Sequence, residues 1–174
     1  MQATKVTASP NWQNTAPSIL VVWLFAVALV CGPAPAIAES TPFKALAGKW
    51  SGWGWVNMLN GGRERVRCKV NYRSSKKTRL NQRIRCNSTS YKIEATTSMK
   101  RKGKRISGSW KESRTNSSGS LSGRANKTGL SLKLNGNAFR AGMSIKLVGK
   151  CKQSVKIDIF GIEIRSVSMQ LKRC

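Results

Sequence analysis

Hydrophobic and polar residues alternate with a period of two along most of the chain after Gly48, and glycine, asparagine and serine interrupt the alternation at short intervals. This pattern is typical of consecutive antiparallel strands, because successive side chains of a strand point to opposite faces of the sheet. No helical stripe competes with it. The pattern predicts about ten strands, some of which we expect to merge, at residues 49–57, 63–72, 79–86, 91–97, 105–111, 118–125, 130–134, 139–148, 155–159 and 162–171.

The clearest alternation lies in the segment 63–72. Its inward face carries Val66, Cys68, Val70 and Tyr72, and its outward face carries Arg63, Arg65, Arg67 and Lys69. The segment 79–86 repeats the arrangement, with arginines again on the outward face, so the two segments are expected to form a hairpin around residues 74–77.

Short, evenly spaced strands joined by tight loops predict an all-β fold in which an antiparallel meander closes into a small barrel of about 8–10 strands, since closure removes exposed strand edges. A two-sheet β-sandwich is the alternative. In the last predicted strand, inward residues change from even to odd positions near Arg165 and Ser166, which indicates a β-bulge.

Four cysteines, Cys68, Cys86, Cys151 and Cys174, remain after the N-terminal segment, and an even number in an exported protein predicts disulfides. Pairing Cys68 with Cys86 gives the hairpin register that its apolar residues already demand. The last hairpin brings Cys151 within reach of Cys174. We therefore predict the bridges Cys68–Cys86 and Cys151–Cys174.

Residues 1–38 have the features of a signal peptide: a polar start, an apolar run at 19–30, and the sequence Ala36-Ile37-Ala38 before Glu39. The apolar run is shorter than the roughly 20 residues that a transmembrane helix needs. We expect cleavage after Ala38, a single domain at residues 39–174, and a periplasmic or secreted location. The part after Ala38 keeps all six acidic residues and loses only Lys5 of the 32 basic ones, which leaves a net charge of +25.

The composition argues against catalysis. The chain has no histidine, and its few carboxylates are isolated from one another, so general-base, metal-binding and paired-carboxylate sites lack their usual residues. We predict a non-enzymatic protein without a cofactor or a bound metal.

The outward faces of the first hairpin predict an anion-binding patch, because a charge of this size needs neutralisation and because Lys69 would lie opposite Arg85. The alternative is that these side chains are solvated and only guard strand edges. The patch consists of Arg63, Arg65, Arg67, Lys69, Arg83 and Arg85. Its partner would be a polyanion: envelope phosphates on an anionic envelope surface, acidic polysaccharide or nucleic acid, bound by a monomer.

Three tryptophans cluster in the first strand at Trp50, Trp53 and Trp55. We predict that Trp50 and Trp110 pack in the core. If alternation is strict, Trp53 and Trp55 face outward as possible aromatic contacts for a ligand; if a glycine bulge reverses the strand, they fill the barrel.

The segment Leu46-Ala47-Gly48-Lys49-Trp50 resembles the opening strand of calycin-type barrels, the lipocalins and avidins. In lipocalins this tryptophan packs at the closed end beneath a basic residue of the last strand, which implies Lys172 or Arg173 here. Together with the segments 106–110 and 119–124, the chain more closely resembles a family of short exported bacterial proteins of unassigned activity. The first segment is also similar to that of periplasmic barrel-type protease inhibitors, which makes inhibition an alternative function, and binding of a small apolar ligand inside the barrel is another.

Overall fold

The computed structural model describes residues 42–174. A short helix precedes ten strands: α1 (Pro42–Leu46), β1 (Gly48–Met58), β2 (Arg63–Ser75), β3 (Arg79–Asn87), β4 (Lys92–Lys102), β5 (Arg105–Glu112), β6 (Ser118–Asn126), β7 (Gly129–Gly136), β8 (Arg140–Val148), β9 (Lys152–Phe160) and β10 (Ile164–Lys172). The predicted signal peptide and its cleavage after Ala38 lie outside the described residues.

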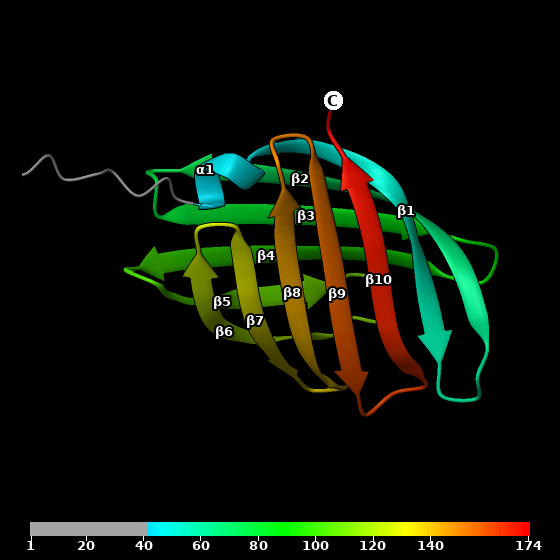
Figure 1. Ribbon diagram of the computed structural model, residues 1–174. Helices are drawn as coiled ribbons and strands as arrows, with labels where there is room; N and C mark the ends of the chain where they lie inside the picture. Colours follow the sequence, from blue (N-terminus) through cyan, green and yellow to red (C-terminus); the bar gives the residue numbers. More distant parts are fainter. Residues whose placement is uncertain (1–41) are drawn as a thin grey trace, which may run out of the picture. The chain divides into compact units, whose positions relative to one another are not determined.

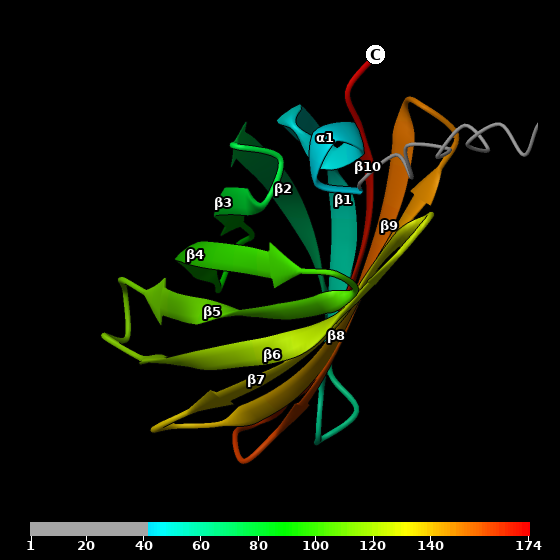
Figure 2. The same cartoon turned by 90° about the vertical axis from the view of Figure 1, so that its left-hand side faces the viewer.

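Each strand pairs antiparallel with the next, and β10 pairs with β1, so the sheet closes into a barrel (Figures 1 and 2). The predicted all-β meander barrel is confirmed at ten strands. The alternative of a two-sheet sandwich is wrong, and so is the expectation that some strands merge, because a turn separates each pair of predicted strands.

The register of the first hairpin follows the apolar pattern. Cys68 lies opposite Cys86, Val70 opposite Ile84, and Tyr72 opposite Gln82. Disulfides join Cys68 to Cys86 and Cys151 to Cys174, as predicted. These bridges are compatible with folding in an oxidising compartment.

The bulge predicted near residue 165 is present in the pairing of β1 with β10. Asn57 lies opposite Ser166, but Met58 lies opposite Ile164, so Arg165 is the extra residue. The bulge restores the inward direction of Val167, Met169 and Leu171, which are all buried.

Helix α1 covers one end of the barrel. Phe43 and Leu46 are fully buried, and the indole nitrogen of Trp50 donates a hydrogen bond to the Leu46 carbonyl oxygen at 2.8 Å. Arg173, which directly follows β10, lies over the Trp50 ring. The predicted packing of Trp50 beneath a basic residue is therefore confirmed, with Arg173 as that residue.

The opposite end carries the β1–β2 and β9–β10 turns, far from α1 and from the C-terminus (Figure 1). We call it the open end. Inward-facing residues toward it, such as Ile93, Met143 and Ile159, are only partly buried, whereas those toward α1, such as Leu80, Met99 and Leu130, are buried. Between residues 42 and 174, no helix is long and apolar enough to cross a membrane.

A few polar side chains face the barrel interior. The hydroxyl of Tyr72 donates to Gln153 Oε1 at 3.4 Å, and burial raises the pKa of that hydroxyl, which keeps it protonated. Gln153 Nε2 and the indole nitrogen of Trp110 are buried and have no hydrogen-bond partner in the described part of the chain.

Candidate functional site

All six residues of the predicted anion-binding patch point outward from β2 and β3 and are exposed. Lys69 lies opposite Arg85, as expected, and Arg67 lies opposite Asn87. The structure nevertheless divides the six residues between two surroundings. The three arginines nearest the start of β2 stack on tryptophans, and the other three residues line a groove.

Trp53 and Trp55 face outward, with exposed fractions of 47% and 37%, while Trp50 and Trp110 lie in the core as predicted. The Arg63 guanidinium lies 3.9 Å from the centroid of the Trp55 ring, and the Arg65 guanidinium lies 4.3 Å from that of Trp53. Arg67 approaches Trp53 more loosely, at 5.5 Å. Such cation–π contacts hold the arginines against the barrel wall.

Glu94 of β4 supplies a counter-ion that the sequence analysis did not foresee. Its Oε1 atom accepts from Arg83 Nη2 at 2.7 Å and from Arg85 Nε at 2.9 Å. The hydrogen bonds from Arg83 and Arg85 lower the pKa of Glu94. A carboxylate of the protein therefore already lies beside Arg85, the residue opposite Lys69.

A hollow with a volume of about 660 Å³ lies on the outer face where β10, β1, β2 and β3 run side by side. Besides Lys69 and Arg85, it is lined by Lys49 of β1 and Lys172 of β10, with Arg173 at its edge. Ser51 and Asn71 contribute polar atoms between these cations.

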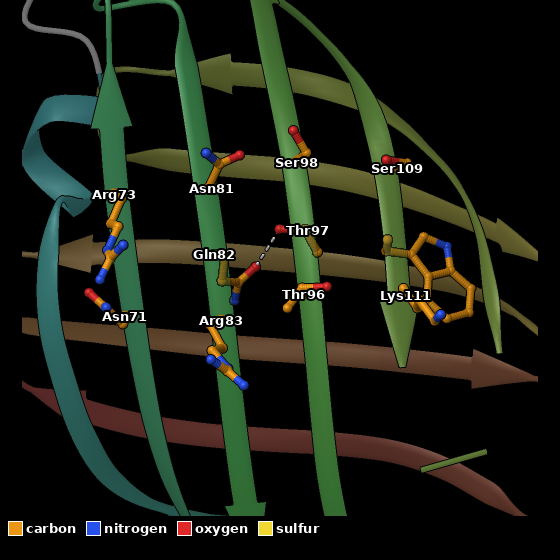
Figure 3. A pocket seen from close by; sticks show the side chains of 11 residues that line it. Asn71, Arg73, Asn81, Gln82, Arg83, Thr96, Thr97, Ser98, Ser109 and Lys111 are labelled. Atoms are coloured by element: carbon orange, nitrogen blue, oxygen red, sulfur yellow. Dashed lines mark hydrogen bonds between the residues drawn. The ribbon is translucent and has the colours of Figure 1, made fainter. Parts of the chain in front are cut away.

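A second hollow of about 450 Å³ continues the first across β2 to β5 and shares Asn71 and Arg83 with it. Figure 3 shows its side chains: Arg73 and Arg83 lie near short polar residues such as Asn81 and Ser98, and Lys111 comes from β5. We call the two hollows together the basic groove. No aspartate or glutamate is among the residues that line either hollow.

Five cations of the basic groove were not predicted from the sequence as site residues: Lys49, Arg73, Lys111, Lys172 and Arg173. Ser51 pairs with both Lys69 and Lys172, which places Lys172 two strands from Lys69. The sequence alone could not place Lys172 near Lys69, because β1 and β10 are the first and last strands and become neighbours only when the barrel closes.

The described residues hold no group of three or more histidine, cysteine, aspartate or glutamate residues that could bind a metal ion. The carboxylates near the open end are held by loops: Glu64 accepts from the Ser90 amide, and Glu112 from the amides of Glu94, Arg114 and Thr115. The Ser90 hydrogen bond lowers the pKa of Glu64. Burial would raise that of Glu112, but the hydrogen bonds lower it overall. These carboxylates are anchors of loops.

No family model matches the sequence, and no curated protein is similar to it. Solved structures match in fold. Rv2717c from M. tuberculosis has a TM-score of 0.63 at 12% identity over 82% of this chain and 99% of its own. The S-type phycobiliprotein lyase CpeS from Guillardia theta has a TM-score of 0.59 at 10% identity, over 76% of this chain and 90% of its own.

A protein of unknown function from the DUF3598 family of Nostoc punctiforme has a TM-score of 0.56 at 11% identity, over 75% of this chain and 48% of that one. At these identities the likeness concerns the fold alone. The likeness agrees with the closed antiparallel barrel described above.

Proposed function

We propose that the protein is a non-enzymatic binding barrel that takes up a small apolar ligand through its open end. The main support for this proposal is the difference in burial between the two ends of the barrel. Apolar side chains under α1 are sealed, whereas inward-facing Ile93, Met143, Ile157 and Ile159 near the open end remain partly accessible to solvent.

The size and lining of the barrel support this proposal. Barrels of eight strands are filled by side chains or hold one small ligand, and the diameter grows with strand number, so ten strands leave more room. Ligand sites are mostly apolar with a few fixed polar groups. The indole N–H group of Trp110, near the end of β5 on the open side, has no partner within residues 42–174 and is a suitable donor for one polar atom of such a ligand. The likeness to a barrel named as a phycobiliprotein lyase is compatible with an interior site.

A neutral, environment-sensitive fluorophore such as N-phenyl-1-naphthylamine tests the proposal. We expect saturable binding with enhanced emission and competition by fatty acids. Ile159→Trp should fill the open end and weaken binding at least tenfold, because Ile159 faces inward beside Ala141. Val148→Trp places the same side chain at the exposed last position of β8, at the α1 end, and should leave binding unchanged. Equal binding by the protein and by the Ile159 variant would contradict an interior site.

A second candidate function, polyanion binding on the outer face, is favoured by the basic groove. Cations from five strands face one concave surface, and short polar side chains between them leave room for an anionic chain to approach the backbone. Clefts lined by one sign of charge concentrate counter-ions. The salt dependence described in the Discussion tests this candidate. Protease inhibition stays a prediction without a structural observation in its favour.

A further inference from the structure

Two large apolar side chains protrude from the open end. Leu59 in the β1–β2 turn is 59% exposed, and Phe160 at the end of β9 is 63% exposed. The two turns are neighbours, since the Leu59 amide donates to the Glu163 carbonyl oxygen at 2.9 Å. Exposed apolar side chains scattered singly need no explanation, but these two lie on adjacent tips at the end where the inward-facing residues are only partly buried.

Arginines surround these apolar tips. Arg140 begins β8 directly opposite Phe160, and Arg63 begins β2 next to the turn that carries Leu59. Arg165 is the exposed bulge residue two positions after Glu163. Carboxylates lie at this end as well. Glu64 is engaged by the Ser90 amide, and Glu112 by the Thr115 amide. Asp158 pairs with Lys156, and Glu163 is exposed.

Trp55 adds an amphipathic side chain on the same flank. It lies on β1 four residues before Leu59, about 13 Å along the strand at ~3.3 Å per residue, and its ring is stacked against Arg63. Tryptophan and arginine side chains suit a membrane interface, because each combines an apolar body with a polar end that remains near headgroups and water.

We infer that the open end docks on an anionic lipid bilayer, with Leu59 and Phe160 inserted at the headgroup boundary and Arg63, Arg140 and Arg165 against lipid phosphates. Apolar insertion combined with attraction to anionic lipid is the usual basis of peripheral membrane binding. A soluble polyanion would use the arginines but would leave both apolar tips in water. The bilayer is the partner that matches both kinds of side chain.

The docking orientation also suggests the ligand's chemical class, and this second part of the inference rests on the proposed function. A barrel docked by its open end presents its partly accessible Ile93 and Ile159 toward the membrane. The ligand would then be an acyl-chain lipid that moves between bilayer and barrel without crossing bulk water.

Vesicle co-sedimentation of the complete mature protein tests the docking. We expect binding to vesicles of phosphatidylcholine mixed with phosphatidylglycerol, and little binding to vesicles of phosphatidylcholine alone. The double variant Leu59→Ser/Phe160→Ser should bind the mixed vesicles at least tenfold more weakly. Its control is Val148→Ser, because Val148 is 54% exposed at the last position of β8, at the α1 end.

The charge contribution is tested by Arg63→Gln/Arg140→Gln/Arg165→Gln, with Lys127→Gln/Lys133→Gln/Lys146→Gln as a control of equal charge. Each cation at an anionic surface contributes roughly fivefold in binding, so the arginine set should lose on the order of a hundredfold and the lysine set far less. Equal losses in the two sets, or full binding by Leu59→Ser/Phe160→Ser, would show that attraction is diffuse and would overturn the docking orientation.

Experiments can reject the docking without rejecting the proposed function, and the reverse. Ile159→Trp should lose the neutral fluorophore and keep vesicle binding, whereas Leu59→Ser/Phe160→Ser should keep the fluorophore and lose the vesicles. If the protein binds vesicles as predicted but no variant or condition shows fluorophore binding, the docking stands and the interior ligand is rejected.

Discussion

The guanidinium of Arg173 lies 4.6 Å from the centroid of the Trp50 ring, and the same side chain joins three segments that are distant in sequence. Its Nη1 atom donates to the carbonyl oxygens of Ala45 and Ala47 at 2.9 and 3.1 Å, and its Nε atom donates to that of Lys150 at 2.7 Å. This one residue therefore holds α1, the β8–β9 turn and the C-terminal end of β10 together over the core tryptophan.

We expect Arg173→Ala to lower the free energy of unfolding by about 2 kcal/mol, since hydrogen bonds from a charged donor contribute roughly 1.5–3 kcal/mol and exposure reduces their value. The free energy of unfolding of Arg173→Lys should lie between those of the unaltered protein and Arg173→Ala, because an ammonium group keeps the charge but lacks the planar guanidinium. Urea unfolding under oxidising conditions measures both. Lys172→Ala is the matched control, with an expected change within about 0.5 kcal/mol. A similar loss in Lys172→Ala would show that only charge matters at this end.

The disulfides give a second prediction. Cys151→Ser/Cys174→Ser should destabilise the protein by roughly 3 kcal/mol, the loop-closure value for a 23-residue separation. The same change at Cys68 and Cys86, which are 18 residues apart, should cost a similar amount. Unfolding curves measure these losses, and non-reducing peptide mapping checks the pairing. A peptide that joins Cys68 to Cys151 would contradict the register of the barrel.

The period-two pattern was enough to predict the strands, the first hairpin's register and the bulge at Arg165, because each buried position must alternate and a shift of one residue would expose the whole set. The direction of Trp53 and Trp55 could not be predicted, since glycines separate them and do not report which face is buried. Glu94 and Lys172 were missed for a different reason. Their partners lie on other strands, and sequence spacing does not give the register between β3 and β4 or between β1 and β10.

Acid should weaken the Glu94 contacts. The folded-state pKa of Glu94 is lowered below its ordinary value of 4.5 by Arg83 and Arg85. A lowered carboxyl pKa contributes stability above pH 4.5 that is lost as the pH falls through the folded value. We therefore expect the urea concentration at the unfolding midpoint to decrease as the pH is lowered below 4.5. Glu94→Gln should make this decrease smaller.

A double-variant comparison isolates the Glu94 contribution. In an Arg83→Gln/Arg85→Gln background, Glu94→Gln should change the acid dependence much less than it does in the unaltered protein. An unchanged effect of Glu94→Gln in that background would assign the acid dependence to Glu94's other surroundings.

The last prediction concerns polyanion binding in the basic groove. Lys69, Arg85 and Lys172 line its first hollow, whereas Arg67 approaches the Trp53 ring, so the three groove residues are the ones to change together. Lys69→Gln/Arg85→Gln/Lys172→Gln should weaken binding to polyphosphate, heparin and single-stranded DNA alike. Because binding releases counter-ions, the slope of log K against log salt for the DNA should become less steep by about 2, at roughly 0.7 per neutralised phosphate. Glu94→Gln should act in the opposite direction, since it frees Arg83 and Arg85 from their internal partner. Lys127→Gln/Lys133→Gln/Lys146→Gln removes the same charge from outside the groove. An equal loss of affinity and slope in that control would show that the whole barrel attracts polyanions as a diffuse cation and that the groove is not a site.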